Sequence, residues 1–203
     1  MTYDYCWYGF KPKSGFELYE IVYEYDIRDL PKVGSDVFRC PSHISKPTGQ
    51  AFGCLFADAY TQSQYKMASG YYGTNSNIIC NYNQDPQEGR QSINPDTREA
   101  ECWVKDYNGN WHRLGRTADA GCDEIGSFDV MSEIYYEGSM NLPSTQKNYT
   151  WIRWIRTNQG WKKPKDCIYC SDDSSDRATW AKIDGWWVGV DNKELRFDAY
   201  IVV

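Results

Sequence analysis

The chain is short of leucine, histidine and long apolar runs. Among its 203 residues only 6 are Leu and 2 are His. No stretch approaches the roughly 18 consecutive apolar residues that a membrane-spanning helix requires, so we expect no membrane span. Lysine and arginine are also scarce relative to acids, giving a formal net charge of −6. A nucleic-acid groove needs clustered basic side chains, so we expect no nucleic-acid partner.

Several catalytic signatures are missing as well. The sequence has no Gly-x-Ser-x-Gly elbow, phosphate-binding loop, His-Glu-x-x-His pair or dinucleotide fingerprint. The two histidines, His43 and His112, stand far apart in the sequence. Imidazole is the side chain that titrates nearest to neutral pH. If the protein is an enzyme, His112, between Trp111 and Arg113, is therefore the first catalytic candidate.

Aromatic residues are abundant: the chain holds 17 Tyr and 9 Trp against 7 Phe. Tyr and Trp supply the buried area that the few aliphatic residues do not provide. Their polar tips also allow them to lie half in water, where they can contact a ligand. We therefore expect the aromatic residues to serve both the core and a binding surface.

Eight cysteines are spread along the whole chain, at Cys6, Cys40, Cys54, Cys80, Cys102, Cys122, Cys167 and Cys170. Cys167 and Cys170 form a Cys-x-x-Cys pair, which suits a reactive dithiol, half a zinc site or a disulfide. No second Cys-x-x-Cys or paired histidine completes a zinc site. An even number of dispersed cysteines is typical of a secreted disulfide framework, so we predict four bridges of unknown connectivity.

Two further features bear on secretion. The segment "NYT" makes Asn148 an acceptor for N-glycosylation. The N-terminal "MTYDYCWYGF" lacks a basic region followed by an apolar core, so we expect no signal peptide in it. On this expectation, either Met1 was added to a mature chain or the protein is not exported by the usual route. The cysteines favour the first alternative, and we predict a secreted protein.

An acidic run follows the Cys-x-x-Cys pair. Asp172, Asp173 and Asp176 are a weak alternative metal site, with calcium as the only cofactor they suggest. Asp172, Ser174 and Asp176 have the one-three-five spacing of a calcium-binding loop, but Arg177 replaces the required Gly and Ile183 replaces the final Glu. We exclude an EF-hand and predict no cofactor.

The segment "GQAFGCLF" and the later "CWVKDYNGNWHRLG" loosely resemble the nucleophile and histidine segments of transglutaminase-like thiol enzymes. Gly53, however, directly precedes Cys54, and the position that would hold the histidine is Glu101 or Cys102. A cysteine nucleophile needs a neighbouring base to form its thiolate. His112 lies on the far strand of the predicted hairpin and does not match that position, so we assign Cys54 to a disulfide.

Alternation of apolar and polar residues predicts strands. In "FELYEIVYEYDI", residues 16–27, tyrosines and isoleucines alternate with carboxylates, which is the period of a half-buried strand. Asn108 and Gly109 predict a hairpin within residues 102–115, and further hairpins are expected within 149–164 and 185–203. The final strand is apolar enough that it should pair on both sides.

Residues 49–67 and 122–138 carry helical spacing but are short, and each fits a helix or an irregular strand. Short strands separated by Gly, Pro, Asn and Asp turns are typical of antiparallel sandwiches and barrels. The sequence therefore predicts one all-β, mainly antiparallel, disulfide-stapled domain spanning 1–203, a sandwich or a barrel with one or two short helices.

Acidic pairs could also support glycosidase chemistry, which needs two carboxylates about 5–10 Å apart. Glu20 and Glu24 share one strand face but stand roughly 13 Å apart along it. A second acid would have to come from a neighbouring strand, which the sequence does not identify.

Recognition of a glycan is the function that the composition favours. Sugar rings stack on Trp or Tyr, and polar side chains bind their hydroxyl groups. A Tyr/Asn-rich segment and a Trp-rich hairpin supply the predicted ligand-binding residues: Tyr71, Tyr72, Asn75, Asn77, Tyr82, Trp151, Trp154 and Trp161.

The first hypothesis is a lectin-like protein that binds a glycan or small molecule. The alternatives are an extracellular enzyme acting on a polysaccharide or an aromatic small molecule in a β-lined pocket, and a structural or adhesive matrix protein. The oligomeric state stays open.

Overall fold

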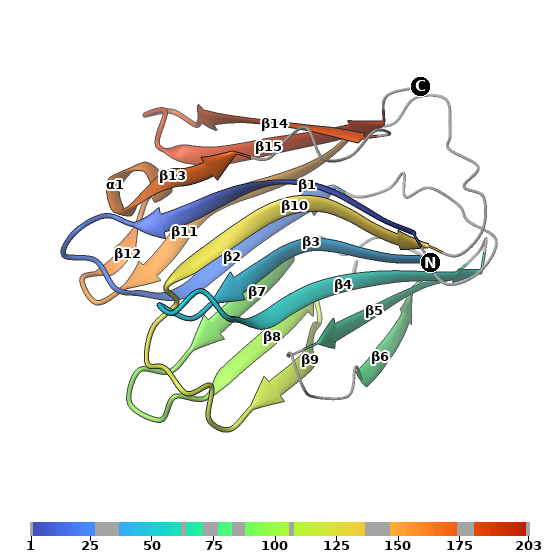
Figure 1. The fold of residues 1–203 in the computed structure, drawn as a ribbon, viewed down its shortest axis with the longest axis horizontal. Coiled ribbons are helices and arrows are strands. Elements are labelled where there is room, and N and C mark those ends of the chain that lie inside the picture. The colour runs from blue at the N-terminus through green and yellow to red at the C-terminus, as the bar shows by residue number, and fades with distance from the viewer. Residues whose placement is uncertain are drawn as a thin grey trace.

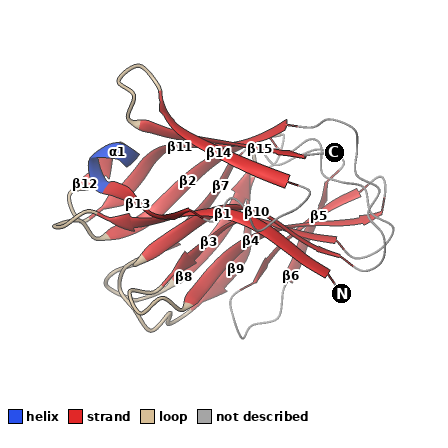
Figure 2. Ribbon diagram, turned by 45° about the horizontal axis from the view of Figure 1, so that its top comes forward, coloured by secondary structure: helices blue, strands red, loops and turns tan. Residues whose placement is uncertain are grey.

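A computed structural model describes residues 2–26, 37–61, 64–70, 77–82, 88–105, 108–136, 147–173 and 181–201. These residues form two antiparallel sheets that pack face to face, with the chain passing repeatedly between them (Figures 1 and 2). The predicted all-β antiparallel architecture is confirmed, and it is a sandwich.

The first sheet has seven strands. In spatial order they are β13 (Ile168–Asp173), β1 (Thr2–Pro12), β10 (Ser127–Tyr136), β3 (Val37–Ser45), β4 (Ala51–Thr61), β5 (Gln64–Gly70) and β6 (Asn77–Tyr82). We call it sheet A; it faces the viewer in Figure 1.

The second sheet, sheet B, has eight strands. Seven of them follow the order β14 (Ala181–Val188), β15 (Glu194–Ile201), β11 (Lys147–Thr157), β2 (Leu18–Asp26), β7 (Glu88–Ile93), β8 (Ala100–Lys105) and β9 (Trp111–Thr117). The short β12 (Gly160–Lys162) pairs with β11. As predicted, the final strand β15 is paired on both sides, by β14 and β11.

The core lies between the sheets and follows the period of two that the sequence shows. In β2, Ile21, Tyr23 and Tyr25 are buried, whereas Glu20 and Glu24 lie on the opposite face. Aromatic rings from both sheets meet inside: Phe10 stacks on Phe128 with centroids 5.2 Å apart, and the ring of Phe197 meets Phe10 edge-on at 5.5 Å. These rings supply the buried area that the few leucines do not.

The predicted hairpins are present as β8–β9, β11–β12 and β14–β15. Their turns contain Gly109, Gly160 and Asn192, with φ of +86°, +84° and +53°. Most of the described residues in the two ambiguous stretches, 49–67 and 122–138, lie in strands β4, β5 and β10. Among the described residues the single helix is α1 (Pro164–Cys167), one turn long.

A polar network crosses the core at Gln91 of β7, which is fully buried. Its side-chain amide donates to the Gly53 carbonyl at 3.1 Å, and its oxygen accepts from the Ser42 hydroxyl at 3.1 Å. Ser42 lies on β3 and Gly53 on β4 of the opposite sheet. Buried hydrogen bonds of this kind fix one arrangement of the strands that they join.

The predicted disulfide framework is not supported. Cys6, Cys102, Cys122, Cys167 and Cys170 are free thiols, and Cys6, Cys102 and Cys167 are buried. Buried cysteine behaves as a small apolar residue, so an even, dispersed count does not by itself imply bridges. For Cys40, Cys54 and Cys80 the structure does not describe whether the thiol is free or bridged. Secretion, which rested on the framework, stays a prediction.

Candidate functional site

The outer face of sheet B carries the largest ordered set of aromatic and charged side chains among the described residues. Strand register sets these side chains in rows across the sheet. One row runs Arg156, Glu20, Ser92, Glu101 and Arg116, from β11 to β9. The next runs Trp154, Val22, Arg90, Trp103 and Arg113. Outward positions alternate with buried ones along β2, β7 and β8, and register shifts against β11 and β9 bring Trp154 and Arg113 into the same row.

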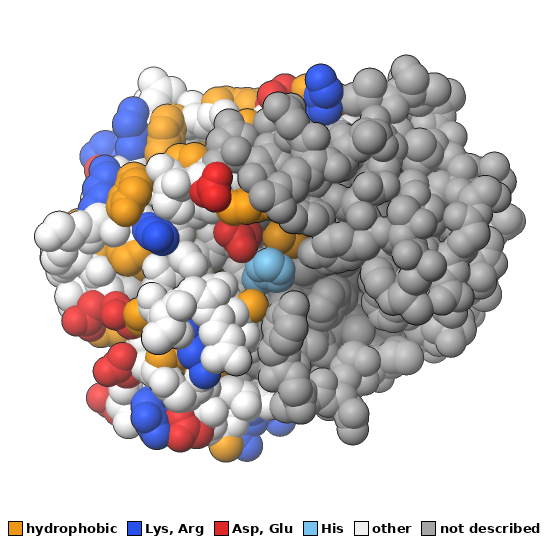
Figure 3. Space-filling model, viewed as in Figure 1, with side chains coloured by type: hydrophobic (Ala, Val, Ile, Leu, Met, Phe, Trp, Pro, Cys, Tyr) orange, Lys and Arg blue, Asp and Glu red, His pale blue; other side chains and the backbone are white. Residues whose placement is uncertain are grey.

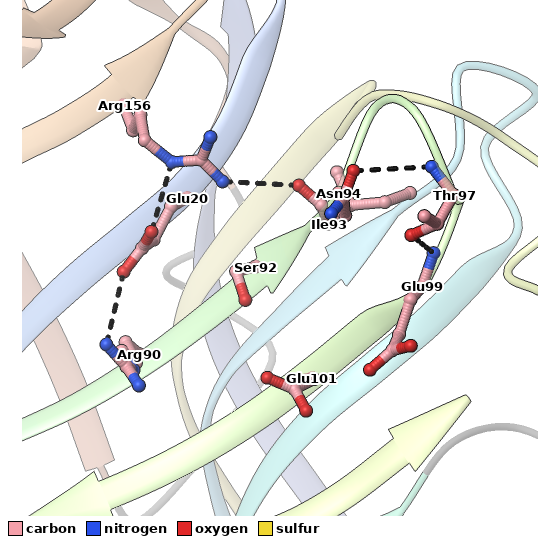
Figure 4. A pocket seen from close by; sticks show the side chains of 9 residues that line it. All are labelled: Glu20, Arg90, Ser92, Ile93, Asn94, Thr97, Glu99, Glu101 and Arg156. Atoms are coloured by element: carbon pink, nitrogen blue, oxygen red, sulfur yellow. Dashed lines mark hydrogen bonds and ion pairs between the residues drawn. The ribbon is translucent and has the colours of Figure 1, made fainter. Parts of the chain in front are cut away.

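A pocket of about 370 Å³ opens at the end of the first row (Figure 4). Its lining comprises Glu20, Arg90, Ser92, Ile93, Asn94, Thr97, Glu99, Glu101 and Arg156. Asn94 shapes the rim because its side-chain oxygen accepts from the backbone N–H groups of Asp96 at 2.9 Å and Thr97 at 3.3 Å. The pocket is therefore polar, and a hydrogen-bonded turn holds part of its rim in place.

Glu101 is the second acid that the sequence could not identify for Glu20. Ser92 stands between them in register, so the two backbones are two strand spacings, about 10 Å, apart. Arginine binds both carboxylates, however. Arg156 Nε lies 3.1 Å from Glu20, and Arg113 donates to Glu101 at 3.2 Å. Arg116 likewise binds the third acid, Glu99, and its hydrogen bonds lower the pKa of that carboxyl.

A glycosidase requires one carboxylic acid that stays protonated near neutral pH, and such an acid has a raised pKa. Of the pocket carboxyl groups, Glu99 has its pKa lowered by Arg116 rather than raised. The pocket offers carboxylate, arginine, amide and hydroxyl groups that can hydrogen-bond a ligand.

Two tryptophans enclose an arginine beside the pocket. The Arg90 guanidinium carbon lies 5.0 Å from the ring centre of Trp103 and 4.9 Å from that of Trp111. The indole N–H of Trp103 donates to Glu101 at 2.9 Å. Both rings are thus held in place by contacts within the protein.

A similar arrangement lies further along the face. Trp151 donates its indole N–H to Glu194 at 2.9 Å, and the Arg153 guanidinium carbon lies 4.4 Å from the centre of its ring. Nearby, Lys163 Nζ lies 4.0 Å from the ring centre of Trp154, whose residue is 45% exposed. This face therefore presents aromatic rings at intervals across most strands of the sheet.

Charges on this face are balanced locally, although the chain as a whole is acidic. Eight of its basic side chains bind a carboxylate: Arg90 and Arg156 bind Glu20, Arg113 binds Glu101, Arg116 binds Glu99, Arg153 binds Glu24, Lys105 binds Glu88, Lys163 binds Glu194 and Arg196 binds Asp198. The face is therefore polar without being strongly charged.

Three predicted ligand-binding residues lie on this face. Trp151 and Trp154 are on β11, and Trp161 of β12 pairs in register with Arg156. Asn77 and Tyr82 are the two ends of β6 at the edge of sheet A, so the structure separates them from the tryptophans. Tyr71, Tyr72 and Asn75 lie outside the described residues.

The other sequence candidates are dispersed. His112 pairs with the buried Val104, so it does not share a face with its neighbours Trp111 and Arg113. Asp172 and Asp173 end β13, and Asp176 lies outside the described residues. In the part of the chain that the structure describes, no three His, Cys, Asp or Glu side chains gather as a metal site would require. Asn148 lies in β11 opposite Ala199, and its glycosylation stays a prediction.

Sequence reasoning did not place Arg90, Trp103, Trp111 and Glu101 in a site. Their alternation with Gln91, Cys102 and Val104 was a usable signal, because it marks them as the outward residues of their strands. Register, which sets them beside one another, comes only from the fold.

Comparisons with known proteins bear on the fold. No protein-family model matches the chain, and no curated protein matches it. Two crystal structures of Scytalido-glutamic peptidase are similar: one with a peptide-based transition state analog (TM-score 0.57, 9% identity, 97% of this chain, 98% of that chain) and one with a transition state analog inhibitor (TM-score 0.55, 10% identity, 96% and 97%). At this identity the likeness establishes the shared β-sandwich alone. Among the described residues no helix is long and apolar enough to cross a membrane.

Proposed function

We propose that the protein binds a neutral glycan on the outer face of sheet B. The observation that carries the proposal is the alternation, across neighbouring strands, of tryptophan rings with arginine–carboxylate pairs around the polar pocket. Sugar rings offer apolar faces that stack on indole and hydroxyl edges that bind planar polar groups. The rows supply both kinds of contact side by side.

The tryptophans are ordered before any ligand arrives. Indole N–H groups of Trp103 and Trp151 already donate to Glu101 and Glu194. Binding then costs little side-chain entropy, since the rings need not be immobilised. An array of fixed rings over several strands favours a chain of several sugar units over a single sugar.

Charge pairing favours a neutral ligand. An acidic polysaccharide would have to compete with the carboxylates that already bind arginines such as Arg90, Arg113 and Arg153. The β-sandwich fold itself does not indicate whether the ligand is neutral or acidic, because one fold can carry many functions.

Glycan-array screening followed by titration calorimetry tests the proposal. A neutral oligosaccharide should bind, and Trp154→Ala should weaken it by about tenfold or more, equal to ~1.4 kcal/mol. The matched control is Tyr169→Ala, because Tyr169 is also 45% exposed but lies on β13 of sheet A. Affinity should change little between low and high salt, since no net charge is neutralised.

Two results would contradict the proposal: binding only to acidic glycans with steep salt dependence, or equal losses from Trp154→Ala and Tyr169→Ala. Self-association without glycan binding would instead favour the matrix-protein alternative. The enzyme alternative would need a pocket carboxylate to act as an acid or base, and Glu20, Glu99 and Glu101 each bind an arginine instead.

A further inference from the structure

One row of side chains crosses the outer face of sheet B from edge to edge, with one residue from each of the seven strands in its path. From β14 to β11, strand pairing aligns Trp186, Arg196 and Trp151. From β2 to β9, it continues through Glu24, Glu88, Lys105 and Trp111. We call these residues the edge-to-edge row. Buried residues such as Leu195, Ile152 and Val104 are their chain neighbours, so alternation turns the row outward.

Exposed tryptophan is concentrated on this side of the molecule. Among the described residues, the tryptophans with exposures from 37% to 50% are Trp111, Trp154, Trp161 and Trp186, and all belong to strands of sheet B. Tyr169 is the exposed aromatic residue of sheet A among them. Figure 3 views sheet A, where the described basic, acidic and hydrophobic side chains lie intermixed. Two of the exposed tryptophans thus stand at the two ends of the edge-to-edge row.

Cations hold the rings of the row in place. Lys105 Nζ lies 5.8 Å from the ring centre of Trp111, whose other cationic contact is Arg90. The Arg196 guanidinium carbon lies 5.6 Å from the ring centre of Trp151. Cation–π attraction of this kind favours one position of each ring.

Ion pairs fill the distance between the rings. Arg153 lies 3.1 Å from Glu24, and Lys105 Nζ lies 2.7 Å from Glu88. The side chains of these residues are between 31% and 47% exposed, so solvent reaches them. The row therefore combines aromatic rings with hydrogen-bonding groups, which are the two kinds of contact that a sugar chain requires.

Strand spacing sets the distance between the rings. Neighbouring strands lie about 4.8 Å apart, so the backbone of Trp151 is roughly 10 Å from that of Trp186 and roughly 19 Å from that of Trp111. A pyranose unit with equatorial linkages is about as long as one strand spacing. The row is roughly 29 Å long, so roughly six such units span it. A chain with axial linkages coils and would leave the row after a few units.

Sheet twist turns the rings out of a common plane. Each strand is rotated by about 20–25° against its neighbour, so the strands of Trp186 and Trp151 differ by about 40–50°. The strands of Trp151 and Trp111 differ by about twice as much. A flat crystalline surface therefore cannot contact all three rings together. A single chain can, because it twists about its glycosidic bonds.

We propose that the edge-to-edge row binds one extended, equatorially linked neutral polysaccharide chain, which lies across the strands of sheet B. The inference rests on the proposed function, because it gives the bound glycan a linkage and a direction. Trp186, Trp151 and Trp111 stack on the apolar faces of sugar units, and the ion pairs between them bind hydroxyl groups. Trp154 and Trp103, in the next row, border the chain on the side of the pocket.

Titration calorimetry with defined oligosaccharides tests the linkage and the length. The extended probes are cellohexaose, xylohexaose and mannohexaose with their trisaccharides, and maltohexaose is the coiled probe. At least one extended hexasaccharide should bind about tenfold or more tightly than its trisaccharide, and tighter than maltohexaose by a similar factor. Crystalline cellulose should not deplete the protein from solution.

Tryptophan variants test the direction of the chain. Trp111→Ala should weaken binding of the hexasaccharide by about fivefold or more and that of the trisaccharide by less than about twofold, because three units span only Trp186 and Trp151. Trp111→Phe should restore part of the loss. Trp161→Ala should cause the smaller loss, since Trp161 is 50% exposed but pairs with Arg156, two rows away. Tyr169→Ala on sheet A is the control and should change nothing.

The outcomes separate this inference from the proposed function. A larger loss from Trp161→Ala than from Trp111→Ala would overturn the inference, since the chain would then follow the strands. Equal affinity for trisaccharide and hexasaccharide, or for maltohexaose, would also overturn it, although glycan binding itself would stand. Binding of no neutral oligosaccharide would overturn both. The thermal midpoint of each variant shows whether a loss of affinity reflects a loss of fold.

Discussion

At the scale of single residues, environment decides what each cysteine does. Cys167 and Cys170 are three residues apart, yet Cys167 is buried and Cys170 exposed. Burial raises the pKa of the Cys167 thiol to about 12, since the charged thiolate is poorly solvated there. The Cys-x-x-Cys pair is therefore not a reactive dithiol, because one member stays protonated.

This difference predicts selective alkylation. With iodoacetamide at pH 8, Cys170 should be modified while Cys167 stays intact, because only the thiolate reacts. Peptide mass spectrometry over a time course measures both rates, and full denaturation should bring the two rates together. Equal rates in the folded protein would mean that Cys167 is not buried in solution.

At the scale of elements, buried polar contacts join the two sheets inside a mostly apolar core. Gln91 of β7 reaches β3 and β4 of the other sheet, and the Tyr25 hydroxyl of β2 lies 3.5 Å from the Ser42 hydroxyl of β3. Leaving Ser42 and Gly53 without the Gln91 partner would strand buried polar groups. The Gln91 contacts thus tie one strand of sheet B to two strands of sheet A.

Gln91→Leu should therefore destabilise the fold by about 1–3 kcal/mol, the typical loss when a buried hydrogen bond is left unmade. Urea unfolding followed by circular dichroism measures the change. Ser92→Ala, at the adjacent outward position of the same strand, should change stability by less than about 0.5 kcal/mol. If Gln91→Leu leaves the free energy of unfolding unchanged, the Gln91 hydrogen bonds do not stabilise the packing of the two sheets.

At the scale of the whole molecule, buried ionisable groups make stability depend on alkaline pH. Burial raises the pKa of Tyr23 well above its ordinary 10.0, and that of Cys167 from 9.0 to about 12. Above pH 9 the unfolded chain releases protons that the folded chain retains. The contribution of these two groups to the free energy of unfolding is therefore fully present below pH 9 and is lost as the pH rises toward 12.

Urea midpoints measured from pH 7 to pH 11 test this prediction. The double variant Tyr23→Phe, Cys167→Ala should show a flatter decline at alkaline pH than the parent chain, whatever its stability at pH 7. A parallel decline in both proteins would assign the alkaline loss to other groups.

The sequence by itself determined the strands. Alternation identified β2 and three hairpins, because a strand that is buried on one side must repeat every two residues. It also placed Trp151, Trp154 and Trp161 on one hairpin, where Trp154 and Trp161 are exposed. The predicted disulfide framework rested on the number and spread of the cysteines alone, and it is not supported. The cysteines whose state is described are free thiols.

Only the tertiary structure decided which residues meet. Glu20 acquires Ser92 and Glu101 as neighbours, and Cys54 acquires His43 and Asp129, through register between strands far apart in the chain. Local propensity carries no information on such pairing, since it is set by core packing and the buried Gln91 contacts. The proposed glycan face therefore arises from strand order.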